Sequence, residues 1–200
     1  LKVLVEQNFN IIGVYTQPPR RKGRGLQIIK SSVHEYALAR NIKVYHPNNF
    51  DSKKDLDIFK GINPDLVIVM GYGHLIPKKM LNIPCYGFIN VHVSLLPRWR
   101  GASPIEYALL NGDEKTGVSL ILLEEKLDAG PIIAQKKIPV VENINRDDLS
   151  DTLTQLGSDL LIDILPRLFA DKIVMQDQNN KEATYAKKIN SQMRKINFNL

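Results

Sequence analysis

The sequence predicts an α/β fold, with a mostly parallel sheet covered by helices on both faces. Short apolar or β-branched runs alternate with helical patterns along the chain, which is typical of repeated strand–helix–strand units. One run, Asp-Leu-Val-Ile-Val-Met at 65–70, is nearly continuous in apolar residues, as in a parallel strand buried on both faces. The chain has 200 residues, a single cysteine and a net charge of +6, which fits a Rossmann-like domain without disulfides.

Six segments are predicted to be strands. Residues 65–70 and 87–93 have the strongest apolar character, and residues 132–141 partly alternate between polar and apolar side chains. This alternation predicts that 132–141 lies near an edge of the sheet, because one face of an edge strand meets water. The other three segments are 11–16, 42–46 and 118–123.

Three shorter helices are predicted from their start and stop residues. Ser32 is the expected N-cap of a helix over 33–40, with Glu35 in capping-box position. A charged helix is expected to begin at Asp51-Ser52, run through Lys60 and end at Gly61. Ser103-Pro104 predicts a third helix start, and Asn111-Gly112 its end.

The longest helix is predicted from about Asp147 to Ala170. Its leucines and isoleucines recur at spacings of three and four, which places them on one face of a helix. Pro166 lies inside this segment and is expected to kink or split the helix. From Gln176 onward the sequence is polar and then rich in lysine, which predicts a linker or surface arm.

The longest uncharged stretch, 80–97, contains prolines, asparagines and a histidine, so it does not fit a transmembrane helix. The lone Cys85 cannot form an internal disulfide, which favours a reducing compartment. We therefore expect a cytoplasmic protein, of a bacterium or an organellar matrix, that does not contact a membrane.

Two polar side chains stand out on the predicted strand 87–93. Asn90 and His92 project on the same side, about 7 Å apart along the strand. In open parallel sheets ligands bind beyond the carboxyl ends of the strands, where an amide and an imidazole can polarise a carbonyl and move a proton. Two polar residues hydrogen-bonded at the sheet edge would satisfy the same spacing equally well.

Asp128 is the third candidate, since it follows the predicted strand 118–123 and its carboxylate can reach the same crevice. On its own, however, an aspartate before Gly130-Pro131 is more typical of a turn.

Several motifs follow one another between Asn90 and Gly130: Asn-x-His, Ser-Leu-Leu-Pro, Arg-x-Arg-Gly-Ala-x-Pro-Ile, Thr-Gly-Val and Leu-Asp-x-Gly. In this order they resemble the 10-formyltetrahydrofolate-dependent formyltransferases. Residues 97–105 are most similar to the branch that acts on methionyl-tRNA, and segments 15–25 and 71–77 are also similar to it. Val93 stands where the family usually has Gly or Ala, and the family's first strand and Gly-Thr-Pro turn are expected to be missing from the sheet.

The resemblance implies roles for individual residues. The family's catalytic residues fall on Asn90, His92 and Asp128, and its folate-contacting segment falls on Ser94, Leu95, Leu96 and Pro97. The implied reaction transfers a formyl group from 10-formyltetrahydrofolate to the α-amino group of methionyl initiator tRNA, for translation initiation. His92 and Asn90 would stabilise the oxyanion, and Asp128 would keep His92 charged. No metal is expected, since the four histidines show no ligand spacing.

A basic segment covers residues 17–30, which contain no acidic residue. The resemblance implies that its cations contact the tRNA, through Arg20, Arg21, Lys22 and Arg24. The alternative for such a charge run is a solvated loop.

Two alternative functions stay open. The first is the same formyl transfer to an amino-sugar nucleotide or a glycinamide ribonucleotide, and the second is a non-catalytic RNA-binding module. The resemblance also implies a catalytic domain over residues 1–176. Residues 177–200 would then form a linker and the start of a C-terminal β-barrel domain that this sequence does not contain. We expect a monomer.

Overall fold

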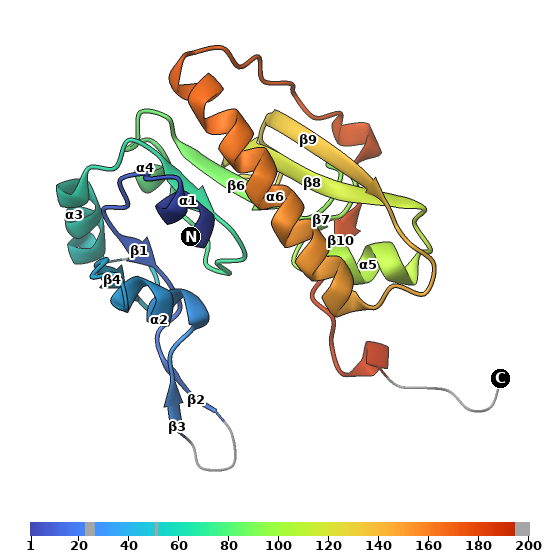
Figure 1. Ribbon diagram of the computed structural model, residues 1–200, viewed down its shortest axis with the longest axis horizontal. Coiled ribbons are helices and arrows are strands. Elements are labelled where there is room, and N and C mark those ends of the chain that lie inside the picture. Colours follow the sequence, from blue (N-terminus) through green and yellow to red (C-terminus); the bar gives the residue numbers. More distant parts are fainter. Residues whose placement is uncertain (23–26, 51, 195–200) are drawn as a thin grey trace. The chain divides into compact units, whose positions relative to one another are not determined.

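The computed structural model describes residues 1–22, 27–50 and 52–194 (Figure 1). These form two compact units, Leu1–Ile89 and Asn90–Leu200. Helices and strands alternate along both, which confirms the predicted α/β class.

Three of the strands described in the first unit lie within the segments predicted for them, but they are shorter. The two strands within residues 20–29 were not predicted. In the parallel pair β1 (Val14–Tyr15) and β4 (Val44–Tyr45), Val14 is opposite Val44. In β5 (Val67–Val69) all three residues are half-buried, so this strand is not covered on both faces as predicted. The reason is its position as the terminal strand in the order β5-β6-β8-β9, where it has a neighbour on one side only.

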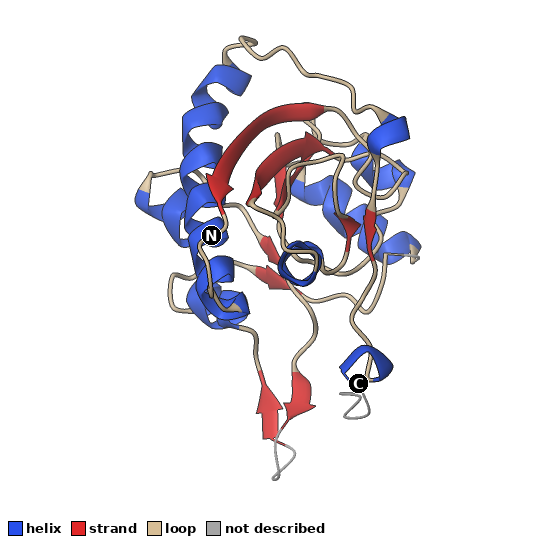
Figure 2. Cartoon of the chain, turned by 90° about the vertical axis from the view of Figure 1, so that its right-hand side faces the viewer, coloured by secondary structure: helices blue, strands red, loops and turns tan. Residues whose placement is uncertain are grey.

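A β-hairpin extends from the body of the first unit (Figures 1 and 2). Its strands β2 (Arg20–Lys22) and β3 (Gln27–Ile29) are antiparallel, with Arg20 opposite Ile29 and Lys22 opposite Gln27. The basic segment is therefore a hairpin arm, at least in its described part. Arg24 lies outside the described residues.

Two helices of the first unit begin or end one or two residues from their predicted positions. The N-cap of α2 (Ser32–Leu38) is Ser31, whose Oγ accepts a hydrogen bond from the N–H of His34, so Ser32 is already helical. In α3 (Lys53–Ile62) the N-cap is Ser52 as expected, but the helix continues through Gly61. It ends at Asn63, whose left-handed conformation (φ 49°) is the usual helix-terminating geometry. The other helices of this unit are α1 (Lys2–Glu6) and α4 (Lys78–Leu81).

Aromatic side chains form the core of the first unit. Tyr15 stacks on Tyr45 with ring centroids 4.8 Å apart, and the rings of Phe50 and Phe59 lie within 6 Å of Tyr15. Phe59 of α3 thus packs on the ring of Tyr15 from β1, which itself stacks on Tyr45 from β4.

β6 (Phe88–His92) crosses the boundary between the two units, and β8 (Lys115–Leu122) and β9 (Ile132–Pro139) of the second unit follow it in the strand order, with β9 at the edge, as predicted. β8 and β9 are antiparallel, with Lys115 opposite Pro139. Only residues 123–131 connect these two strands, which is too short for the crossover that a parallel pair requires.

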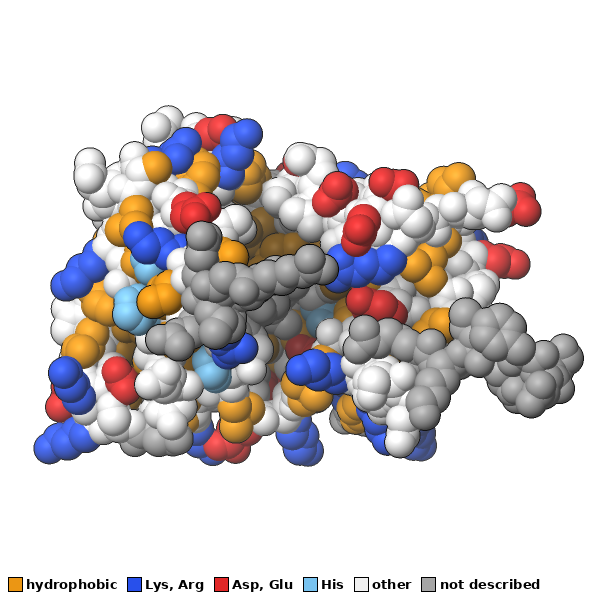
Figure 3. All heavy atoms as spheres, turned by 90° about the horizontal axis from the view of Figure 1, so that it is seen from below, with side chains coloured by type: hydrophobic (Ala, Val, Ile, Leu, Met, Phe, Trp, Pro, Cys, Tyr) orange, Lys and Arg blue, Asp and Glu red, His pale blue; other side chains and the backbone are white. Residues whose placement is uncertain are grey.

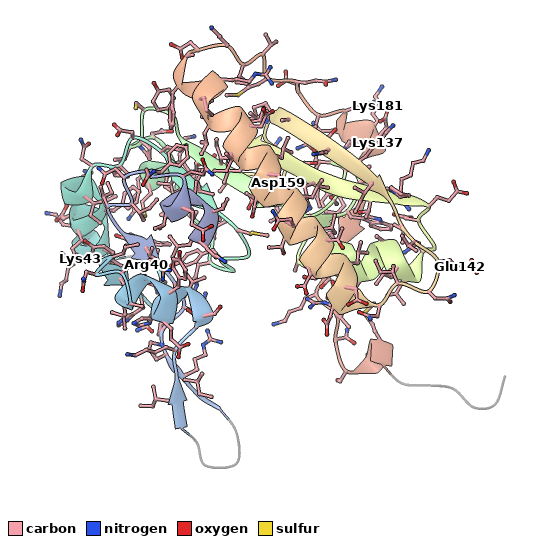
Figure 4. The ribbon with its side chains drawn as sticks, viewed as in Figure 1. Arg40, Lys43, Lys137, Glu142, Asp159 and Lys181 are labelled. Atoms are coloured by element: carbon pink, nitrogen blue, oxygen red, sulfur yellow. The ribbon has the colours of Figure 1, made fainter. Side chains whose placement is uncertain are left out.

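The long helix α6 (Arg146–Phe169) packs on β8 and β9 (Figure 1). It is one helix and is not split at Pro166, because the proline lies in its last turn and removes only one helical hydrogen bond. Asn145 caps its start by accepting hydrogen bonds from the N–H groups of Asp147 and Asp148. The predicted apolar face is buried, including Leu149, Leu153, Leu156, Leu160, Ile164 and Leu168. Asp159, labelled in Figure 4, is exposed on this helix.

The remaining elements of the second unit are short. Ser103-Pro104 begins α5 (Pro104–Leu110), as predicted. The short strand β7 (Arg100–Gly101) pairs in parallel with β10 (Tyr185–Ala186), and the 3₁₀ helices are η1 (Asn180–Glu182) and η2 (Gln192–Arg194).

The polar segment after residue 176 is partly packed against the second unit. Gln178 and Ala186 are buried, and Gln176 exchanges two backbone hydrogen bonds with Ile132. The proposed division at residue 176 stays a prediction. Within the described ranges, no helix is both long and apolar enough to span a membrane.

Candidate active site

Asn90 and His92 are on one face of β6, as the strand alternation predicts. Their neighbours Ile89 and Val91 are buried, and a Cβ added at Gly157 of α6 would lie 2.8 Å from Val91 Cγ1. The close approach of α6 thus fixes β6 from behind. The amide and the imidazole are left on the opposite face of the strand.

Asp128 brings the two side chains of β6 together. Its Oδ1 accepts a hydrogen bond from Nδ2 of Asn90 at 3.1 Å, and its Oδ2 accepts one from the N–H of Gly101 at 2.9 Å. Oδ2 also lies 3.7 Å from Nδ1 of His92. Asp128 has a left-handed backbone (φ 46°), which a short polar residue tolerates better than most. The turn therefore aims this buried carboxylate at both predicted partners.

The protonation of His92 follows from its second contact. Its Nε2 lies 2.9 Å from the carbonyl oxygen of Trp99. A carbonyl oxygen can only accept, so Nε2 carries a hydrogen. Nδ1 is the ring nitrogen that faces the carboxylate of Asp128.

Trp99 is held in a conformation that is rare for a large side chain, with φ 61°. Its backbone N–H donates to Thr184 Oγ1 at 2.9 Å, and its indole Nε1 donates to Asp113 Oδ2 at 2.7 Å. Arg98 donates two hydrogen bonds to the same carboxylate, and these, together with the indole, hold the pKa of Asp113 below its ordinary value. These contacts anchor the carbonyl group that orients His92.

Hydrogen bonds to other protein groups hold the Ser-Leu-Leu-Pro segment, residues 94–97, in its conformation. Ser94 is buried, and its Oγ donates to the carbonyl of Arg98 at 2.6 Å. Ser119 on β8 donates to the carbonyl of Ser94 and accepts from the N–H of Leu96, while Gln135 donates to the carbonyl of Leu96. Leu96 is buried, whereas Leu95 and Pro97 are half-buried and present part of their surface.

The predicted tRNA-contacting residues belong to the first unit. Arg20 is exposed, and its Nη2 donates to Oε1 of Gln17 at 2.8 Å. Arg21 and Lys22 follow it in β2. On the face shown in Figure 3, basic and acidic side chains are interspersed.

Sequence reasoning missed the residues that support Asp128 from its main-chain side. Nε2 of the buried Gln178 donates to the carbonyl oxygens of Asp128 and Gly130, at 2.9 and 2.7 Å. Its Oε1 accepts from both Nε and Nη2 of Arg100. No local sequence pattern predicts this contact, because Gln178 is 50 residues from Asp128 and lies in a segment with the composition of a polar linker.

No group of three His, Cys, Asp or Glu side chains that could hold a metal ion occurs in the part of the chain that the structure describes.

Comparison with known proteins decides the family. A formyl transferase family model matches residues 3–165. The chain belongs to the formyl transferase family. Its catalytic-site candidates on β6 fall inside the matched region, while Gln178 lies beyond it.

Curated relatives cover nearly all of the chain. It is 43% identical over 197 residues to the methionyl-tRNA formyltransferase of Dictyoglomus thermophilum, covering 98% of this chain and 63% of the relative. Identity to the enzyme of that name from Legionella pneumophila (strain Corby) is 40%, covering 99% of this chain and 63% of the relative. The chain thus spans less than two thirds of the length of these curated relatives.

Solved structures confirm the fold of this chain. A phosphoribosylglycinamide formyltransferase from Bacillus halodurans superposes with a TM-score of 0.71 and 24% identity, covering 84% of this chain and 88% of that one. An N-formyltransferase from Helicobacter canadensis, in complex with folinic acid and dTDP-3-aminofucose, has a TM-score of 0.69 at 22% identity, covering 98% and 69%. At these identities the likeness concerns the fold alone.

Proposed function

We propose that this chain transfers a formyl group from 10-formyltetrahydrofolate to the α-amino group of methionyl initiator tRNA. The observation that carries the chemistry is the contact of Asp128 with both Asn90 and His92. The acceptor is proposed from the relatives named methionyl-tRNA formyltransferase, which are about 40% identical over nearly the whole chain. The proposed setting is translation initiation, in a bacterial cytoplasm or an organellar matrix.

The reaction needs a hydrogen-bond donor at the formyl oxygen and an acceptor for the proton of the amine. The free amine attacks the formyl carbon, and negative charge develops on the oxygen of the tetrahedral species. Nδ1–H of charged His92 and the second N–H of the Asn90 amide stabilise that oxygen. The 3.7 Å between Nδ1 and Asp128 Oδ2 exceeds a hydrogen bond, so Nδ1–H is not taken up by the carboxylate and can donate to the formyl oxygen.

Proton transfer completes the step. Asp128 keeps His92 protonated and takes up the proton that the amine loses on attack. As the carbon–N10 bond breaks, a proton returns to N10 of the folate. The new amide and tetrahydrofolate leave, and no charge is left over. This chemistry requires no metal.

The folate contacts are proposed for the loop Ser94, Leu95, Leu96 and Pro97, with a division of labour. Ser94 and Leu96 are buried and hydrogen-bonded within the protein, so they give the loop its shape. The half-buried Leu95 and Pro97 supply the apolar surface for the donor.

The tRNA contacts are proposed for Arg20, Arg21 and Lys22 of β2 and for Arg24, because closely spaced cations can follow a phosphate backbone. We also propose that residues 177–200 lead into a further domain, since the relatives are longer than this chain.

A formyl-transfer assay tests this proposal, with 10-formyltetrahydrofolate as donor and two acceptors offered in parallel. We expect formylation of methionyl-tRNA and none of a dTDP-linked amino sugar. Formylation of the sugar alone would show that the proposed acceptor is wrong and that the proposed formyl-transfer chemistry is right. Absence of transfer to either acceptor, with the folate donor bound, would favour the RNA-binding alternative.

A further inference from the structure

Arg100 is a buried cation with neutral partners. The residue is 3% exposed. Its Nε and Nη2 donate to Gln178 Oε1, and Nη2 also donates to Asn180 Oδ1 at 3.0 Å. Both acceptors are amide oxygens. Among the described residues no carboxylate lies within ion-pair distance of Arg100, and no hydrogen bond from its Nη1 is found.

Burial of the Arg100 charge beside neutral partners costs free energy unless an anionic group also pairs with it. Burying a guanidinium removes water from a charge that amide oxygens neutralise only in part. In proteins a buried arginine usually meets a carboxylate or a phosphate, because its planar fork matches two anionic oxygens. Arg100 already uses its Nε edge on Gln178, so the Nη1 side is left for an external ligand.

A surface hollow opens beside this arginine. Its volume is about 450 Å³, and its lining residues are Arg100, Lys126, Leu127, Ala129, Asn180 and Tyr185. Lys126 adds a second positive charge, and the ring of Tyr185 is 55% exposed. Glu124 and Glu125 are on the same loop as Lys126, but they are not among the lining residues. The hollow thus combines two cations, an amide and an exposed aromatic ring.

We propose that this hollow binds a phosphate group of a nucleotide, with Arg100 and Lys126 as its anion-binding groups and Tyr185 against the sugar or base. The phosphate would belong to the formyl acceptor, and this assignment rests on the function proposed above. A phosphate fits better than a single carboxylate, since its several oxygens can meet the guanidinium and the lysine together.

The hollow is connected to Asp128 both along the chain and through a hydrogen-bonded side chain. Leu127 and Ala129, which line it, flank Asp128 in the chain. Gln178 links the two sites directly, because its Oε1 accepts from Arg100 and its Nε2 donates to the carbonyl of Asp128. A phosphate held at Arg100 is therefore linked through Gln178 to the backbone of Asp128, and in our proposal it anchors the acceptor beside the candidate site.

Asn180→Asp is the sharpest variant for a test. Asn180 is exposed at the start of η1, so the fold tolerates an aspartate there. Its carboxylate would keep the hydrogen bond from Nη2 and would add the negative charge that Arg100 lacks. The new carboxylate would then neutralise the positive charge of Arg100 and weaken its attraction for an external anion. Asn143→Asp is the matched control, since it makes the same charge change at an exposed position of the same unit, outside the hollow.

The experiment titrates the chain with adenosine 5′-monophosphate and with adenosine, while the Nε–H resonance of Arg100 is followed by NMR. Arg100→Lys assigns that resonance through its disappearance. We expect the monophosphate to shift the resonance saturably and adenosine to leave it unchanged. Asn180→Asp should raise the Kd for the monophosphate at least tenfold, and Asn143→Asp should leave it within twofold.

Several outcomes would overturn the proposal. These are equal binding of adenosine and its monophosphate, an unchanged Kd in Asn180→Asp, or no shift with any phosphate compound. Displacement of the monophosphate by p-aminobenzoylglutamate would reassign the hollow to a carboxylate ligand. No formyl donor is present in this titration, so its result is independent of the transfer assay. Loss of the proposed function would leave a measured phosphate site intact, and the reverse also holds.

Discussion

Nδ1 of His92 faces Oδ2 of Asp128 across 3.7 Å, while Nε2 of the same ring is held 2.9 Å from the carbonyl oxygen of Trp99. The carbonyl fixes Nε2 as a nitrogen that carries a hydrogen, and the other ring nitrogen faces the carboxylate. In the proposed mechanism the charged form of His92 presents Nδ1–H to the substrate without moving its ring. That property suits an oxyanion that forms and disappears within one turnover.

Ser119→Ala tests how the Ser94–Pro97 loop is held. Removal of the buried Oγ leaves the N–H of Leu96 and the amide of Gln135 with a partner missing. We expect a loss of about 1–3 kcal/mol in the free energy of unfolding, the cost of buried unpaired polar groups. KM for the folate donor should rise more than kcat falls. Urea denaturation and steady-state kinetics measure both, and the exposed Ser191→Ala is the control. An unchanged stability would show that Ser119 does not organise this loop.

A pair of helical glycines tests the packing of α6 behind β6. Gly157→Ala gains helix propensity, but its Cβ would lie 2.8 Å from Val91 Cγ1, so we expect a net loss of about 1 kcal/mol or more. Gly61→Ala in α3 meets nothing within 4 Å and should gain about 0.5–1 kcal/mol. Thermal denaturation of both variants provides the comparison. A gain of equal size at the two positions would contradict the close contact of α6 with β6.

The Asp113 carboxylate predicts a pH dependence of stability. Hydrogen bonds from Arg98 and then Trp99 lower its pKa in the folded state. A lowered pKa means that this group stabilises the fold above its unfolded pKa of about 3.9. That contribution is lost as the pH falls through the lower folded value.

Asp113→Asn should therefore be less stable than the wild type at pH 7. We expect no more than about 1 kcal/mol, because Arg98 is largely exposed to solvent. The difference should shrink as the pH is lowered below 4. Urea unfolding at pH 7, 5 and 3 measures this trend, and a difference that stays constant with pH would contradict an ionic origin.

Arg24→Ala tests the proposed role of the hairpin arm. Loss of one phosphate contact should weaken binding of methionyl-tRNA and reduce the slope of log Kd against log salt concentration by about 0.7–0.9. Folate binding should be unaffected. Arg40→Ala is the control, because this arginine is another exposed cation of the first unit, stacked over Tyr36 (Figure 4). If both variants change the slope equally, the arm is no more than one part of a general positive surface.

The sequence predicted most elements because their determinants are local. Ser52, Ser103 and the apolar face of α6 lie in windows of a few residues, and the structure agrees with them. Errors arose where a longer-range or finer geometric effect decides. Asn63, in its left-handed conformation, ends α3 in place of Gly61, and β5 is half-buried, although its apolar sequence predicted burial on both faces.

The candidate site shows the same division. Asn90 and His92 were predictable from strand alternation, and their contact with Asp128 was implied by the order of family motifs. The carbonyl of Trp99, the N–H of Gly101 and the side chain of Gln178 were not predictable. Backbone groups have no sequence signature, and Gln178 reaches the site only because the segment beyond α6 folds back onto β7.

The turnover of His92→Ala and Asp128→Asn is the most direct test of the central claim. Asparagine tolerates the left-handed backbone of Asp128 and keeps an acceptor oxygen, so that variant removes the charge with little effect on the turn. We expect kcat for formyl transfer to methionyl-tRNA to fall at least ~100-fold in each variant, the low end for a positioned acid–base group. Asp159→Asn, which changes an exposed carboxylate on α6, should retain full activity (Figure 4). Near-full turnover in both site variants would contradict the assignment of His92 and Asp128 to the chemistry.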